Sequence, residues 1–172
     1  MYESLLKKVE KGKQTIIQKQ HKRKTKGTTM IINATNLIAG RLATVVAKKA
    51  LLGEEITIIN CENAVITGRR DTVLAQRKQR RDRGTPTAGP YCPRMPDQML
   101  KRMIRGMLPY KQERGEAAFK RIMCYRGVPI QLQDKVQQAT TIKEADAAKL
   151  PYKKFVTLGE IAKFLGANWY EG

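Results

Sequence analysis

The stretch MIINATNLIAGRLATVVAKKALLGEEITIIN, residues 30–60, predicts the architecture of this chain. It opens with the apolar run MIINA, residues 30–34, and closes with the run ITIIN, residues 56–60. Between them, apolar residues from Leu37 to Leu52 recur with the period of a helix, and Gly53 fits a C-terminal cap. Continuous apolar strands joined by an amphipathic helix are typical of a βαβ unit, in which parallel strands are covered on both faces and the crossover is right-handed. The sequence therefore predicts an α/β fold.

A βαβ unit is also the unit that binds dinucleotides, so a nucleotide site is an alternative. Gly40 lies at the start of the helix, and Glu62 lies at the end of the second strand, where a ribose-binding acid is expected. Neither GxGxxG nor GxxxxGK[ST] is present, so the chain offers no glycine-rich cradle for phosphate. We interpret Gly40 as a close-packing or turn glycine.

The charge of the chain is large and regional. Lys and Arg number 34 against 15 Asp and Glu, which gives a net charge of +19. Residues 1–29 carry +7, residues 30–68 carry 0, residues 69–126 carry +11 and residues 127–172 carry +1. Because a polyanion neutralises such self-repulsion, nucleic acid is the first partner to consider and an anionic membrane the second. This distribution predicts a neutral scaffold with two polyanion-binding surfaces.

Few residues favour catalysis or metal binding. His21 is the only histidine, and the three cysteines, Cys61, Cys92 and Cys124, are widely spaced without a CxxC pair. This argues against histidine catalysis, a disulfide framework and a zinc knuckle. We expect no catalytic residues, metal, cofactor or small-molecule substrate. No stretch has the apolar length of a transmembrane helix and the N-terminus lacks the apolar run of a secretory signal, so we expect an intracellular protein without a membrane partner.

Residues 1–29 are expected to form a basic, partly flexible N-terminal extension, and residues 30–172 a single α/β domain. The extension begins with apolar residues at helical spacing and ends in the basic segment QKQHKRKTKGTT, in which Lys22, Arg23 and Lys24 are candidate RNA contacts. A mitochondrial transit peptide is a weaker interpretation, because the extension has one arginine and two glutamates.

The densest basic segment is TGRRDTVLAQRKQRRDRG, residues 67–84. Asp71 is expected to cap a helix whose apolar contact is limited to Val73 and Leu74. Such a helix needs an anion, and arginine suits bidentate contacts to phosphate and stacking on bases. A solvated charged face is the alternative. The candidate RNA-binding residues of this segment are Arg69, Arg70, Arg77, Lys78, Arg80, Arg81 and Arg83.

The segment TPTAGPYCPRMP, residues 85–96, predicts an extended loop because its four prolines exclude a helix or an inner strand. Tyr91 and Arg94 are candidates for stacking on nucleotides or contacting them. A tyrosine that covers the core is an equally good interpretation of Tyr91.

Residues 98–115, QMLKRMIRGMLPYKQERG, predict a helix with one face on the core and the other on phosphate. The expected core stripe is Leu100, Met103, Ile104, Met107 and Leu108, and the expected RNA face is Lys101, Arg102 and Arg105. Gly106 suggests that something closely approaches its backbone, because glycine destabilises a helix by up to ~1 kcal/mol relative to alanine. Pro109 ends the helix, and Lys111 and Arg114 continue the positive surface.

Two further elements are expected. IMCYR, residues 122–126, predicts another buried strand. In FVTLGEIAKFLG, residues 155–166, Thr157 and Glu160 predict a capping box at the start of a helix that Gly166 stops.

Five motifs, taken in order, resemble a known family. They are NLIAGRLATVVAKKALLGEEITIIN (36–60), NAVITGRR (63–70), GPY (89–91), IRGMLPYKQERGEAAF (104–119) and FVTLGEI (155–161). Over roughly residues 30–170 the chain resembles the L-thirteen family of large-ribosomal-subunit proteins, in its archaeal and eukaryotic-type branch.

The resemblance implies a three-layer α/β/α domain around a four-stranded parallel sheet. It implies a structural constituent of the cytoplasmic ribosome that binds large-subunit rRNA during early assembly and lies beside neighbouring large-subunit proteins. The positions that match the family are Gly68, Arg69, Arg105, Gly106, Lys111, Arg114 and Gly115. Tyr110 stands where relatives of this branch often have histidine, so a role for an imidazole does not transfer. The alternatives are an α/β nucleotide-binding enzyme and a basic DNA-compacting protein.

Overall fold

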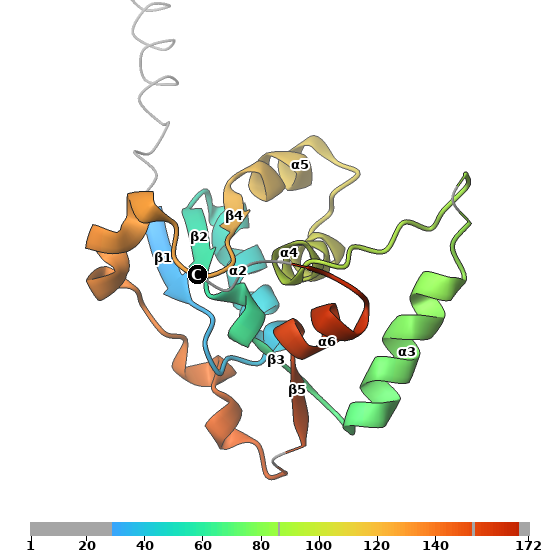
Figure 1. The fold of residues 1–172 in the computed structure, drawn as a ribbon. Coiled ribbons are helices and arrows are strands. Elements are labelled where there is room, and N and C mark those ends of the chain that lie inside the picture. Colours follow the sequence, from blue (N-terminus) through green and yellow to red (C-terminus); the bar gives the residue numbers. More distant parts are fainter. Residues whose placement is uncertain (1–28, 86, 153, 169–172) are drawn as a thin grey trace, which may run out of the picture.

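The computed structural model describes residues 29–85, 87–152 and 154–168 of the 172-residue chain. The expected basic extension lies outside this part apart from Thr29, and its candidate RNA contacts Lys22, Arg23 and Lys24 lie outside it too. The described residues form a mixed α/β fold with a parallel sheet, as the sequence predicts (Figure 1).

The predicted βαβ unit is confirmed. It consists of β1 (Thr29–Asn33), α2 (Ala39–Leu52) and β2 (Glu55–Ile59). The two strands pair in parallel along their whole length, from Thr29 beside Glu55 to Asn33 beside Ile59. Gly53 caps α2 in the left-handed conformation at φ 105°, and its N–H donates to the carbonyl of Ala50. A left-handed glycine satisfies the last carbonyls of a helix and turns the chain into the next strand.

The parallel sheet has three strands in the described residues, in the order β1, β2, β4 (Ile122–Cys124). The fourth parallel strand that the resemblance implies is not confirmed by these residues. Beyond β1 there is a single parallel bridge from Ile32 to Thr140, in which the N–H of Thr140 donates to the carbonyl of Ile31 at 2.9 Å. The chain leaves this edge after one residue, because η2 (Ile130–Gln138) precedes it and a further short helix follows.

A second, antiparallel sheet was not expected from the sequence. It pairs β3 (Val65–Thr67) with β5 (Phe155–Thr157). A parallel bridge between Ile38 and Val65 ties β3 to the start of α2. This small sheet lies beside α6 (Leu158–Phe164), which follows β5 directly (Figure 1).

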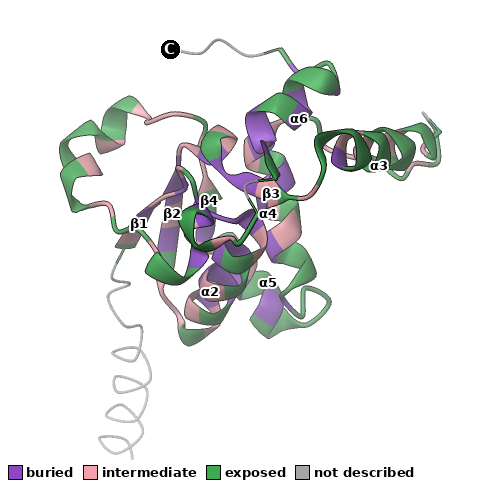
Figure 2. Ribbon diagram, turned by 90° about the horizontal axis from the view of Figure 1, so that it is seen from below, coloured by how far each residue is buried: buried purple, intermediate pink, exposed green. Residues whose placement is uncertain are grey.

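The helices cover one face of the parallel sheet more fully than the other. Ile56, Ile58 and Ile122 are completely buried in a core shared with α2, α4 and α6 (Figure 2). On the opposite face, Ile31 and Ile59 are buried, whereas Thr57 is only partly buried and Met123 is 44% exposed. Among the described residues, the expectation of strands covered on both faces therefore holds fully for one face and in part for the other.

The remaining helices include those that overlap the basic segments at residues 67–84 and 98–115. In chain order, the remaining helices are η1 (Cys61–Asn63), α3 (Arg70–Asp82), α4 (Pro96–Gly106), α5 (Glu113–Lys120), η3 (Lys143–Ala145) and η4 (Ala147–Lys149). Helix α4 buries Leu100 and Ile104 as predicted, and Leu108 is buried just beyond it. Met107 is 44% exposed because α4 ends at Gly106, one residue before it, so its place in the predicted core stripe is wrong.

Two further details of the sequence interpretation change. Helix α3 begins at Arg70, so Asp71 lies in its first turn and makes no capping hydrogen bond. Its negative charge still favours the positive end of the helix dipole. Gly40 lies inside α2 and a Cβ there would meet no atom within 4 Å, so it is neither a turn nor a close-packing glycine. At α6 the predicted cap is present, since the Thr157 hydroxyl accepts from the Glu160 N–H at 3.1 Å.

Candidate nucleic-acid interface

Helix α3 projects from the body of the protein (Figure 1), and little apolar surface holds it there. Val73 is its one buried residue, and Leu74 is partly buried against the core. Two of its arginines bind α6 and its C-terminal end: Arg70 Nη2 lies 3.7 Å from the Glu160 carboxylate, and Arg81 Nη1 donates to the carbonyl of Leu165 at 3.2 Å. Arg70 and Arg81 therefore help to hold α3 in place.

The loop between α3 and α4 is attached to both helices. Cys92 Sγ donates to the carbonyl of Arg80 at 3.5 Å, and Arg102 Nη1 of α4 donates to the carbonyl of Tyr91. Close to α3 the chain passes so near itself that a Cβ on Gly84 would lie 2.6 Å from the Pro90 carbonyl oxygen. These contacts hold the loop in a fixed position between two basic helices.

The outer side of α4 combines cations with aromatic rings. The Lys101 ammonium lies 5.1 Å from the centre of the Phe119 ring, and the Arg105 guanidinium lies 4.4 Å from the centre of the Tyr110 ring. Both pairs are within the range of cation–π attraction. They hold charged groups in place while leaving their hydrogen-bond donors available to a phosphate.

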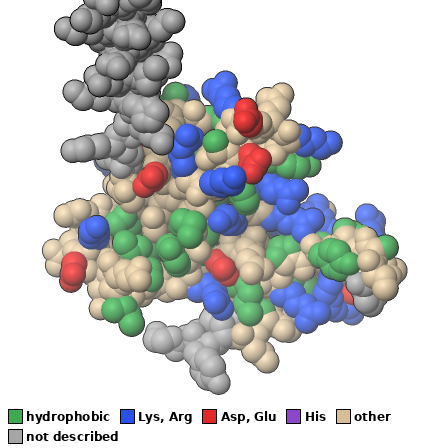
Figure 3. Space-filling view, turned by 90° about the horizontal axis from the view of Figure 1, so that it is seen from above, with side chains coloured by type: hydrophobic (Ala, Val, Ile, Leu, Met, Phe, Trp, Pro, Cys, Tyr) green, Lys and Arg blue, Asp and Glu red, His purple; other side chains and the backbone are tan. Residues whose placement is uncertain are grey.

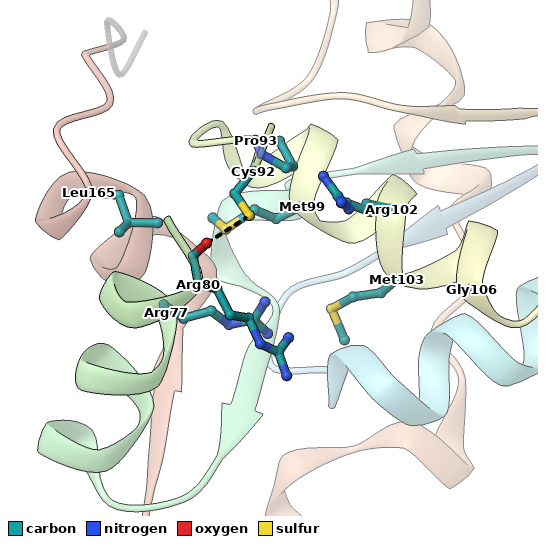
Figure 4. A pocket seen from close by; sticks show the side chains of 9 residues that line it. All are labelled: Arg77, Arg80, Cys92, Pro93, Met99, Arg102, Met103, Gly106 and Leu165. Atoms are coloured by element: carbon teal, nitrogen blue, oxygen red, sulfur yellow. Dashed lines mark hydrogen bonds between the residues drawn. The ribbon is translucent and has the colours of Figure 1, made fainter. Parts of the chain in front are cut away.

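A hollow of about 310 Å³ lies where α3, the loop, α4 and the end of α6 meet, and we call it the α3–α4 hollow (Figure 4). Arg77 and Arg80 point into it from α3, opposite Met103 of α4. Its lining residues are Arg77, Arg80, Cys92, Pro93, Met99, Arg102, Met103, Gly106 and Leu165. The lining of the hollow therefore combines apolar side chains with guanidinium groups.

The arginines of the α3–α4 hollow are held close together without compensation. Burial lowers the pKa of Arg77 below its ordinary value, and the neighbouring charge of Arg80 lowers it further. Among the residues that the structure describes, no carboxylate forms an ion pair with Arg77, Arg80 or Arg102. Like charges that are partly removed from water are destabilising by themselves and are neutralised by a bound anion.

A second hollow of about 370 Å³ lies on the other side of the loop. It shares Cys92, Pro93 and Arg102 with the first, and it is also lined by Tyr91, Gln98, Lys101, Arg105 and Phe119. Tyr91 is 67% exposed, so the interpretation of this tyrosine as a core residue is wrong. It lines this second hollow, and its hydroxyl donates to the carbonyl of Thr87 at 3.0 Å.

The structure brings most of the candidate residues onto one half of the molecule. Figure 3 shows Lys and Arg side chains gathered over the half that carries α3 and α4, while few lie over η2. Lys78, Arg80, Arg83, Arg94, Arg102 and Arg105 are exposed there, and Arg77 and Lys101 are partly buried. Arg69 is exposed at the start of α3, and Lys111 and Arg114 are exposed at the turn into α5.

The family-matching glycines have different surroundings. A Cβ on Gly115 would lie 2.1 Å from the Pro109 carbonyl oxygen, and one on Gly68, at φ +139°, would lie 2.9 Å from the Val73 side chain. Those two positions require glycine for packing. A Cβ on Gly106 would meet no atom within 4 Å, so no described protein atom accounts for the close approach predicted there.

Residue types alone did not indicate three contributors to this surface. Cys92 and Met99 line the α3–α4 hollow, and Phe119 lies under Lys101. The only signal in the sequence is that Cys92 lies between two basic helices and beside Pro93. Their arrangement depends on the angle between α3 and α4, which no local pattern specifies.

Glu62, which was considered for a nucleotide site, and the neighbouring Cys61 have structural partners instead. The carboxylate of Glu62 accepts from the N–H of Gly127 through both oxygens, at 3.2 and 3.1 Å. A hydrogen bond between the Cys61 and Cys124 thiols, together with burial, raises the pKa of the Cys61 thiol, so it is a neutral core group. Within the described ranges, no helix has the length and apolar character needed to cross a bilayer.

Comparison with known proteins places the chain beside one family. The sequence profile of a family described as ribosomal protein L13 matches residues 27–131. The chain is 47% identical to the large ribosomal subunit protein uL13 of Methanosarcina barkeri over 81% of its own length and 99% of that protein. It is 44% identical to the protein of that name from Methanopyrus kandleri, over 79% of this chain and 86% of the relative. The protein of that name from Methanococcoides burtonii is 43% identical, over 81% of this chain and 99% of the relative.

Proposed function

Because the chain belongs to the ribosomal protein L13 family, we propose that it is a structural, non-enzymatic constituent of the large ribosomal subunit. It binds large-subunit rRNA, supports early assembly of the subunit and remains in the ribosome in the cytoplasm. Its partners are the large-subunit rRNA and neighbouring large-subunit proteins.

The observation that carries this proposal is the convergence of Arg77, Arg80 and Arg102 between α3 and α4 with no acidic partner in the described part of the chain. Guanidinium groups form bidentate contacts with phosphate and stack on bases. The phosphates of a sugar-phosphate chain supply the negatively charged partners for these groups. A protein without a polyanion partner has no compensating gain for holding like charges together.

The proposed contact surface follows the basic helices and their connections. Arg70 and Arg81 are proposed to contact the RNA with only part of their guanidinium groups, because each also bonds to α6 or to its C-terminal end. The proposed RNA-contacting residues are Arg69, Arg70, Arg77, Lys78, Arg80, Arg81, Arg83, Tyr91, Arg94, Lys101, Arg102, Arg105, Gly106, Lys111 and Arg114. Lys22, Arg23 and Lys24 of the N-terminal extension are proposed to add further contacts.

We also propose that residues 30–172 form one rRNA-binding domain and that residues 1–29 are its basic extension. Support comes from the core, which includes residues from Ile32 to Ala167 in one cluster. The family arrangement of four strands and three layers would require the segment at Thr140 to extend its pairing with β1. The single bridge between Ile32 and Thr140 is the observation that supports such an extension.

Binding to RNA as a function of salt tests the proposal. Filter binding with large-subunit rRNA and with duplex DNA of equal length, at matched salt, separates an rRNA-binding protein from a DNA-compacting one. If about 6 to 10 phosphates are neutralised, the affinity for rRNA falls by about 10³- to 10⁵-fold between 50 and 200 mM salt. A flat curve over this range, or a preference for duplex DNA, would contradict the proposal.

A further inference from the structure

The α3–α4 hollow has a composition that suits one nucleotide better than a phosphate alone. Met99, Met103 and Leu165 contribute apolar side chains to its lining, while Arg77 and Arg80 point into it from α3 (Figure 4). A phosphate needs only the cations, whereas apolar side chains next to cations offer a surface for the face of a base. A volume of about 310 Å³ is at the small end of the pockets that hold small ligands.

Gly106 provides a second observation. It lies on the lining of the hollow at the last residue of α4, and the volume that its Cβ would occupy is empty of described protein atoms within 4 Å. A larger side chain at this lining position would have open space beside the hollow. The absent side chain therefore leaves the hollow open to a ligand.

The surroundings favour a nucleotide that belongs to a strand. The second hollow shares Cys92, Pro93 and Arg102 with the first and adds the aromatic rings of Tyr91 and Phe119. Positive charge thus continues beyond the α3–α4 hollow, as a strand with a phosphate at each nucleotide requires. Proteins recognise such single-stranded segments by taking unstacked bases onto aromatic or apolar side chains, whereas the bases of an A-form duplex are not free to leave the stack.

We propose that the α3–α4 hollow receives one unstacked nucleotide of the bound rRNA. The base lies against Met99, Met103 and Leu165, and its phosphate lies between the guanidinium groups of Arg77 and Arg80. This inference rests on the proposed function, because it names the part of the rRNA that the same surface takes.

A matched pair of glycine variants tests this inference. Gly106→Leu adds a bulky side chain to the lining of the hollow, and Gly40→Leu adds the same side chain to a helix at another position where a Cβ meets no atom within 4 Å. The probe is large-subunit rRNA transcribed in vitro, and the readouts are filter-binding affinity and ribose reactivity along the RNA. We expect Gly106→Leu to weaken binding by about 5- to 150-fold, the loss that corresponds to one stacked base. In the complex with Gly106→Leu, we expect the ribose reactivity of the RNA to change at one unpaired nucleotide and its neighbours. We expect Gly40→Leu to behave as the unmodified protein.

A measurement on the unmodified protein provides an independent test. Cys92 lines the hollow and Cys124 lies on β4, so both thiols are followed during N-ethylmaleimide modification with and without saturating rRNA. We expect bound rRNA to slow the modification of Cys92 and to change that of Cys124 little, because a base held in the hollow covers the Cys92 thiol. An unprotected Cys92 in the saturated complex, or unchanged affinity of Gly106→Leu, would overturn the inference and leave the proposed function intact. Failure of the unmodified protein to bind rRNA would overturn the proposed function itself.

Discussion

Removing the positive charge of Arg77 and Arg80 together should weaken RNA binding without weakening the fold. The change is Arg77→Gln with Arg80→Gln, which keeps polar side chains of similar length. Burial and the charge of Arg80 lower the pKa of Arg77, so the folded protein holds this cation in an unfavourable environment. Like-charge pairs one turn apart on a helix are destabilising by about 0.2 to 0.5 kcal/mol. The free energy of unfolding should therefore stay the same or rise slightly.

The size of the binding effect follows from counterion release. Each phosphate that a cation neutralises contributes about 0.7 to 0.9 to the slope of the logarithm of affinity against the logarithm of salt concentration. Loss of both cations should lower the slope by about 1.4 to 1.8. Over a fourfold rise in salt, from about 50 to 200 mM, the variant should lose about 7- to 12-fold less affinity than the unmodified protein.

Filter binding at several salt concentrations and thermal unfolding measure the two effects. A control with the same change of net charge is Lys135→Gln with Lys143→Gln, two exposed lysines on η2 and η3, away from α3. The control should keep a slope close to that of the unmodified protein. An equal change of slope in both variants would refute the assignment to α3, because only total charge would then matter. A clear loss of thermal stability on removing Arg77 and Arg80 would instead make them structural residues.

Three further changes test the structure. Thr157→Ala removes the hydroxyl that caps α6 and should destabilise the protein by about 1 kcal/mol. Thermal unfolding would show this as a fall of about 2 to 4 °C in the midpoint temperature. An unchanged midpoint would mean that the cap does not contribute to stability. Gly115→Ala places a Cβ 2.1 Å from the Pro109 carbonyl oxygen and should cost about 1 to 3 kcal/mol in chemical denaturation, whereas an unaltered midpoint would show that this turn relaxes freely. Iodoacetamide at neutral pH should modify Cys92 and leave Cys61 intact, because burial keeps the Cys61 thiol neutral and raises its pKa; mass spectrometry that finds Cys61 modified in folded protein would contradict this.

Local sequence patterns predicted the elements that are long or carry their own signals. The helical period between Leu37 and Leu52 and the flanking apolar runs identified the βαβ unit, because such a unit has to bury one stripe and two continuous strands. The hydroxyl of Thr157 identified the start of α6 for an equally local reason. The three-residue strands β3 and β5 were missed, since each is too short to show an alternation of its own.

The number of strands in the parallel sheet is set by long-range packing. Thr140 reaches the edge of β1 with a single bridge, and the residues around it do not continue the pairing. The resemblance to a family implies four strands. The length of a strand at Thr140 depends on how the short helices before and after it direct the chain.

The basic surface was predicted in its composition and only partly in its arrangement. The density of arginine along α3 and the charged side of α4 were visible as patterns. That Arg81 turns inward to the carbonyl of Leu165, while Arg77 and Arg80 face Met103 across a hollow, depends on the orientation of α3. Periodicity places residues on a face of a helix but does not say what that face meets.

Sedimentation of extract from the source cells through a sucrose gradient tests the central claim most directly. The protein should migrate with the large ribosomal subunit and remain there after a wash at moderate salt, because many phosphate contacts act together. The washed subunit should release it only when the salt is high enough to compete for those phosphates. Recovery of the protein at the top of the gradient, apart from ribosomal particles, would contradict the account.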